Sequence, residues 1–134
     1  MGSPSTRLSW FTAFAQRLSE VGWIEGRSVA IVLRWAEGRN ERFAEIAAEF
    51  VTLKVNVIVT GGAAVPAMKQ ATSTIPIVFS LANDPVGSGY VTSLARPGGN
   101  VTGLSGQSTD LIGKRLELLR EVMPTSPPAG HHWR

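Results

Sequence analysis

The stretch Val55-Asn-Val-Ile-Val-Thr-Gly-Gly-Ala-Ala-Val-Pro-Ala-Met-Lys-Gln-Ala-Thr72 contains a complete strand-to-helix transition. The branched apolar run Val55–Thr60 is typical of a strand that is buried in a sheet. Two glycines follow it at once, and Pro66 then suits the first turn of a helix over about 65–72, because its missing N–H removes no hydrogen bond there. The next apolar run, Ile75–Ser80, predicts another strand. Strand, helix and strand in this order predict a right-handed unit with parallel strands.

The same alternation extends in both directions along the chain. Apolar spacing predicts helices on either side of this unit, and β-branched runs predict strands between them. The further expected elements are a helix over Arg7–Val21 capped by Ser5 or Thr6 with Gly22 at its exit, a strand over Val29–Leu33, a helix after Asn40, a short helix through Tyr90 and Leu94, a strand over Val101–Gly103, and a helix over Asp110–Met123. We therefore predict an α/β fold, a three-layer Rossmann-like lobe with a mainly parallel sheet.

Composition excludes several classes of function. The 134 residues suit one domain, and the net charge of +3 comes from scattered side chains without a basic run, so nucleic-acid binding is not expected. The chain has no cysteine, which excludes disulfides, thiolate metal sites and a cysteine nucleophile. The histidines are His131 and His132, in a tail over 125–134 that is expected to be disordered. We expect no metal, no cofactor and no catalysis.

Three loops follow predicted strands at the edge of the sheet where open α/β folds bind ligands. In the first, Thr60, Gly61, Gly62 and Ala63 lead into a helix, whose free N–H groups attract anions. A tight turn that needs glycine explains this loop equally well. It lacks the glycine pattern and lysine of nucleotide-binding loops.

The second loop offers Ser80, Asn83 and Asp84, which are a hydroxyl, an amide and a carboxylate. Asp84 could hold a ligand ammonium or cap the next helix. A third polar loop, Ser105–Asp110, is better explained as a connection and a helix cap. These loops favour a binding site over a catalytic one.

Five motifs resemble the substrate-binding proteins of bacterial ABC transporters, in the group that includes tryptophan- and tyrosine-type binders. They are Arg34-Trp-Ala-Glu-Gly-Arg39, Thr74-Ile-Pro-Ile-Val-Phe79, Asp84-Pro-Val86, Leu94-Ala-Arg-Pro-Gly-Gly-Asn-Val-Thr-Gly103 and Lys114-Arg-Leu-Glu-Leu-Leu-Arg-Glu121. The resemblance covers about Ser3 to Pro124, as one lobe over 3–124. It implies two lobes around a ligand cleft, a permease partner, and export to the periplasm or a lipid anchor. An amino-acid-like ligand would place its carboxylate on the helix after Gly62 and its ammonium near Asp84.

The sequence departs from this family pattern at both ends. The expected first strand and the second lobe are missing, and the polar N-terminus lacks a signal segment, so the chain as written is expected to stay in the cytoplasm. Without a central strand, the unpaired edges predict a homo-oligomer, and a single lobe predicts weakened or lost binding. The alternatives are a small-molecule sensor domain of a regulator and an enzyme of nucleotide or sugar-phosphate chemistry.

Overall fold

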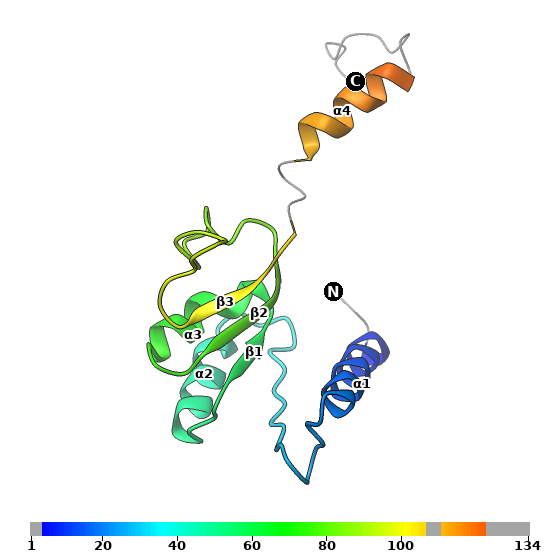
Figure 1. The fold of residues 1–134 in the computed structure, drawn as a ribbon. Coiled ribbons are helices and arrows are strands. Elements are labelled where there is room, and N and C mark those ends of the chain that lie inside the picture. The colour runs from blue at the N-terminus through cyan, green and yellow to red at the C-terminus, as the bar shows by residue number, and fades with distance from the viewer. Residues whose placement is uncertain (1–3, 107–110, 123–134) are drawn as a thin grey trace. The chain divides into compact units, whose positions relative to one another are not determined.

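A computed structural model of the chain describes residues 4–106 and 111–122. The chain divides into two compact units, Met1–Arg42 and Phe43–Arg134, and each is described by itself (Figure 1). The tail over 125–134 lies outside the described residues, as does Asp110, where the last helix was expected to start.

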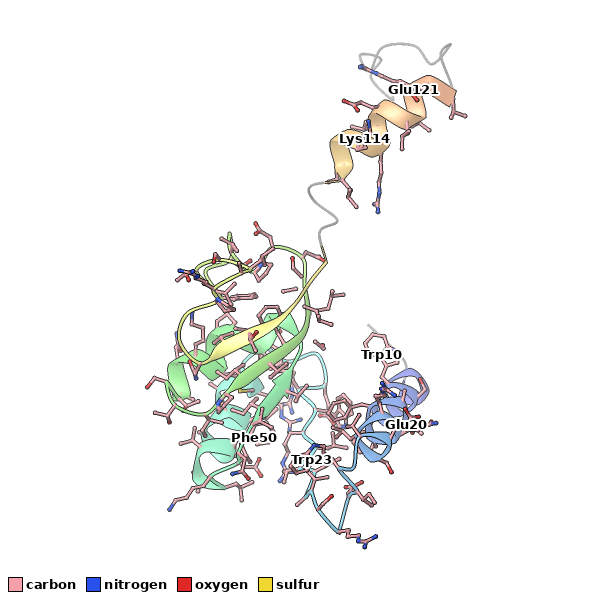
Figure 2. All side chains as sticks on the ribbon, viewed as in Figure 1. Trp10, Glu20, Trp23, Phe50, Lys114 and Glu121 are labelled. Carbon is pink, nitrogen blue, oxygen red and sulfur yellow. The ribbon has the colours of Figure 1, made fainter. Side chains whose placement is uncertain are left out.

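The first unit begins with the helix α1, Pro4–Glu20. The helix ends as its sequence predicts, because Gly22 takes a left-handed φ of 94° and the Trp23 N–H donates to the Leu18 carbonyl at 2.8 Å. Its start differs from the prediction. Ser5 and Thr6 lie inside the first turn and Pro4 opens the helix, a position that suits proline. Trp10 and Trp23 are exposed side chains of this unit (Figure 2).

The strand expected over Val29–Leu33 is wrong. In this segment the structure has an isolated parallel bridge between Glu25 and Val29, and residues 30–33 form no strand. The Gly26 N–H donates to the Val29 carbonyl at 2.9 Å, so the bridge closes a local turn. A β-branched run favours an extended backbone, but a strand also needs a neighbour for its N–H and C=O groups.

The second unit holds a three-stranded parallel sheet in the order β1-β2-β3 (Figure 1). Its elements along the chain are the helix α2 (Arg42–Thr52), β1 (Ile58–Thr60), the 3₁₀ turn η1 (Gly62–Ala64), the helix α3 (Val65–Ala71), β2 (Ile77–Ala82), β3 (Val101–Ser105) and the helix α4 (Ile112–Val122). The predicted α/β class with parallel strands is confirmed. Lys114 and Glu121 project from α4, whose side chains are all exposed or half-exposed (Figure 2).

One face of this sheet forms the core. The buried strand residues are Ile58, Ile77, Phe79, Ala82 and Val101, which lie on one face of the sheet. The helices α2 and α3, which lie behind the sheet in Figure 1, supply further buried side chains. These are Ile46, Ala47, Val65 and Met68. The core therefore fixes the two loops that follow β1 and β2.

The first strand is shorter than its apolar run predicts. Lys54 takes a left-handed φ of 52°, and the Val55 N–H donates to the Phe50 carbonyl at 3.3 Å. This is a helix-terminating arrangement, so residues 55–57 complete the exit from α2 before pairing begins at Ile58.

The short helix expected through Tyr90 and Leu94 is also wrong. Residues 85–89 form consecutive turns, in which the Tyr90 and Val91 N–H groups both donate to the Pro85 carbonyl. Gly89 takes a φ of 70°, which interrupts helical geometry. The buried ring of Pro85 anchors this segment to the core instead.

Candidate functional site

The loops after β1 and β2 meet at the carboxyl edge of the sheet. A Cβ atom on Gly62 would lie 3.1 Å from the Leu81 carbonyl oxygen and 3.3 Å from the Ala82 Cβ. Only a glycine lets the turn approach the end of β2 this closely without a shift. The sequence prediction that these two loops share one edge is therefore consistent with their geometry.

The start of the third loop joins them. The Gly106 N–H donates to the Ala82 carbonyl at 2.8 Å, and a Cβ on Gly106 would lie 3.6 Å from the Asn83 Oδ1 atom. The sequence analysis placed Ser105–Asp110 at this edge as a third candidate loop but favoured a plain connection and a helix cap. The sequence feature that pointed to this contact was Gly106, directly after β3. Residues 107–110 lie outside the described residues.

Polar side chains at this edge are available to a ligand. Thr60, Ser80 and Asn83 make no side-chain hydrogen bond within the described part of the chain. Ser80 and Asn83 are exposed and Thr60 is half-buried. The η1 turn is closed by the N–H groups of Ala64 and Val65, so those of Gly62 and Ala63 precede its first internal bond. The edge thus presents both donors and acceptors.

Asp84 caps a turn. Its Oδ1 atom accepts a hydrogen bond from the Gly87 N–H at 2.8 Å, and its carbonyl accepts from the Ser88 N–H at 3.0 Å. A Cβ on Gly87 would collide with this carboxylate, so the glycine is required for the cap. Asp84 therefore acts as a cap, as one of the two sequence interpretations expected. It caps a turn, because the expected helix does not form. The Oδ2 atom accepts no hydrogen bond in the described chain.

Two side chains that the sequence interpretation missed hold the segments on either side of β2: Lys69 contacts the loop after β2, and Asn100 contacts the segment before it. Lys69 of α3 donates to the Gly89 carbonyl at 2.8 Å and to the Tyr90 carbonyl at 3.2 Å. Asn100 donates to the Thr72 carbonyl at 3.2 Å and to the Ile75 carbonyl at 2.8 Å. Both side chains contact residues at least 20 positions away, so no local pattern could reveal these contacts.

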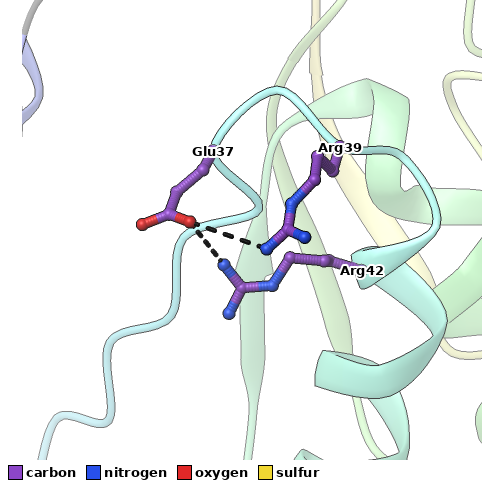
Figure 3. Close-up of polar contacts among 3 residues, drawn as sticks. All are labelled: Glu37, Arg39 and Arg42. Atoms are coloured by element: carbon purple, nitrogen blue, oxygen red, sulfur yellow. Dashed lines mark hydrogen bonds and ion pairs between the residues drawn. The ribbon is translucent and has the colours of Figure 1, made fainter.

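The motif Arg34–Arg39 forms a tight turn in the first unit. Glu37 and Gly38 take φ values of 55° and 81°, and the Arg39 N–H donates to the Ala36 carbonyl at 2.9 Å. The Glu37 carboxylate lies 2.8 Å from Arg42 and 3.9 Å from Arg39 (Figure 3). These charges are paired with one another, and an exposed pair contributes only about 0–1 kcal/mol. The cluster is a feature of the turn, in which one carboxylate faces two guanidinium groups.

The described residues hold no cluster of three or more His, Cys, Asp or Glu side chains able to bind a metal ion. Among them, none of the helices combines the length and the apolar character needed to cross a membrane.

Comparison with known proteins identifies the family. The sequence model of the ABC transporter substrate binding proteins matches residues 4–127. The chain belongs to this family. The motifs quoted above from 34–39 to 114–121 all fall within the matched range.

The substrate-binding family includes a curated relative of this chain, the tyrosine-binding protein of Clostridioides difficile. The two are 33% identical over 118 residues, which is 87% of this chain and 34% of the relative. The chain therefore spans about a third of the length of this relative.

Two solved structures have a similar fold. A conserved domain protein from Vibrio cholerae matches with a TM-score of 0.74 and 35% identity, over 85% of this chain and 38% of that one. A domain from Streptococcus pneumonia, solved in complex with L-Trp, matches with a TM-score of 0.69 and 28% identity, over 84% and 39% of the two chains.

Proposed function

We propose that this chain is a ligand-binding lobe of the solute-binding component of an ABC-type uptake transporter, and that its ligand is an amino acid or a related small molecule. The observation that carries the proposal is the convergence of the Gly62, Asn83 and Gly106 loops at the carboxyl edge of the parallel sheet. Ligands of open α/β folds bind at this edge. The names of the tyrosine-binding relative and of the L-Trp complex support an amino-acid ligand over a regulator's effector or a nucleotide.

The proposed contacts follow from the charges of an amino acid. The α-carboxylate would accept hydrogen bonds from the Gly62 and Ala63 N–H groups, with Thr60 and Gly61 alongside. The ammonium group would lie against Asp84, with Ser80 and Asn83 as neutral partners. Asp84 can serve both purposes, because its Oδ1 atom holds the cap and its Oδ2 atom accepts no other hydrogen bond. No catalytic step is part of this proposal, and a permease partner and an exported or lipid-anchored location come with the family.

The test is a titration of the ¹⁵N-labelled chain with L-tryptophan and L-tyrosine. We expect saturable shifts of the Gly61 and Gly62 amides with low affinity, because one lobe encloses only one side of the ligand. N-acetyl-L-tryptophanamide, which lacks both charges, is the matched control ligand. The absence of saturable shifts with both amino acids up to their solubility limits would refute the proposal.

Variants of Asp84 separate its two roles. Asp84→Asn keeps an oxygen that can cap Gly87 but removes the charge, so we expect unchanged stability and about tenfold weaker amino-acid binding. Asp84→Ala should weaken binding in the same way and also lower the free energy of unfolding by about 1 kcal/mol, because the cap is lost. Equal affinity in the wild type and Asp84→Asn would remove Asp84 from the site.

A further inference from the structure

The central strand β2 carries an irregularity at the candidate site. Phe79 pairs with Gly103 and Ala82 pairs with Ser105, so Ser80 and Leu81 stand opposite the single residue Leu104. This is a β-bulge, which is rare between parallel strands and often lies next to a functional site, where it redirects a side chain. The bulge lies at Ser80 and Leu81, just before Asn83 and Asp84 of the candidate site.

The bulge changes which side chain enters the core. With regular alternation, the residue two positions after Phe79 would share its buried face. Ala82 occupies that face instead, and Leu81 is turned outward with 57% of its surface exposed. The extra residue thus moves a leucine out of the core and puts a small alanine in its place.

Leu81 lies between two loops of the candidate site. Its Cδ1 atom lies 3.1 Å from the position that a Cβ on Gly106 would take, and its carbonyl oxygen lies 3.1 Å from the corresponding position on Gly62. Ser80 and Asn83 flank this leucine with polar groups. An apolar surface with a few polar groups beside it is the usual composition of a small-molecule site.

We propose that Leu81 is a specificity-determining residue, which contacts the apolar side chain of the ligand while the polar loops hold its charged groups. This inference rests on the proposed function and adds to it that the ligand class is an amino acid with a large apolar or aromatic side chain. An exposed leucine leaves apolar surface in water, and contact with an apolar ligand removes that surface from water.

The experiment measures L-tryptophan binding to Leu81→Asn, Leu81→Met and the control Leu53→Asn by NMR titration. Leu53 is a matched control, because it is 51% exposed and follows α2 at the opposite, amino-terminal end of the strands. We expect Leu81→Asn to weaken L-tryptophan binding by about tenfold, and Leu81→Met and Leu53→Asn to stay within about twofold of the wild type. Retained dispersion of the amide spectrum shows that each variant is folded.

The outcomes separate this inference from the proposed function. If the affinity of Leu81→Asn for L-tryptophan stays within about twofold of the wild type, the role of Leu81 is overturned. The proposed function is not affected by that result. An equal loss in Leu81→Asn and Leu53→Asn would also overturn it. If the wild type binds no amino acid, the proposed function fails and this inference falls with it.

Discussion

At the scale of single residues, the position of Gly103 requires a glycine because of Phe79, its partner in the neighbouring strand. A Cβ on Gly103 would collide with the carbonyl oxygen and the ring of Phe79. That ring is 2% exposed and meets Tyr90 edge-on, with 6.3 Å between the ring centroids, so it has no room to move away. The close contact of β2 and β3 near the site therefore depends on the absence of a side chain at this position.

We predict that Gly103→Ala lowers the free energy of unfolding by about 2–3 kcal/mol, because the added methyl group overpacks the sheet. Gly61→Ala is the control, since nothing lies within 4 Å of its added Cβ and its φ of −80° suits any residue. We expect the control to change the free energy by less than about 0.5 kcal/mol. Urea unfolding followed by far-UV circular dichroism measures both variants, and equal midpoints would contradict the argument.

The residue types at the candidate site could be predicted from the sequence, but their spatial relations could not. Thr60–Ala63 and Ser80–Asp84 stand out because polar or glycine residues directly follow apolar runs. The exposure of Leu81 depends on a bulge, and an extra residue in one strand becomes visible only against the register of its partner. The same holds for Gly106, whose role depends on its approach to Asn83.

At the scale of elements, the apolar runs predicted three strands correctly and Val29–Leu33 incorrectly. The three strands that form, β1, β2 and β3, find hydrogen-bonding partners in one another. The run at Val29–Leu33 has the same composition but no ladder in the described chain. Propensity describes how well a segment suits a sheet, whereas pairing depends on which neighbour is present.

The loop between β2 and β3 is held to α3 by Lys69, which donates to the carbonyls of Gly89 and Tyr90. We predict that Lys69→Met raises the amide exchange rates of residues 86–91 by about tenfold, because a methionine fills similar space but donates no hydrogen bond. Exchange in β2 should stay unchanged. Hydrogen–deuterium exchange with residue resolution tests this, with Lys114→Met of α4 as the control. Equal amide exchange rates of residues 86–91 in the wild type and both variants would show that these turns are stable without the Lys69 hydrogen bonds.

At the scale of the whole molecule, the proposed site would contact one side of a bound ligand. It spans 38% of the Vibrio cholerae protein and 39% of the L-Trp complex that share its fold. Affinity for small molecules normally requires that most of the ligand surface is enclosed. The weak binding expected of this chain follows from that geometry and does not depend on any defect in the loops themselves.

The sheet of the second unit also leaves surfaces that suit a second copy of the chain. Among the described residues, β1 and β3 each have one edge without a partner strand. The face opposite the core carries Val59 and Leu104, and Leu104 is 70% exposed. Parallel strands are usually covered on both faces, and uncharged edges readily pair with other chains. The apolar side chains of α4 are exposed as well, at Leu111, Ile112, Leu116, Leu118, Leu119 and Val122.

We predict that the purified chain is a dimer or a larger oligomer, with an interface that buries more than about 1,000 Å². Light scattering coupled to size exclusion at micromolar concentration measures the mass. The double variant Val59→Lys, Leu104→Lys places charges on the open sheet face and should shift the mass toward the monomer, because charged side chains on such a surface oppose association. Lys substitutions at the exposed residues Gln70 and Ser73 provide a control with the same added charge. A wild-type mass of 14.3 kDa, the value for one chain, would show that these surfaces need no second copy.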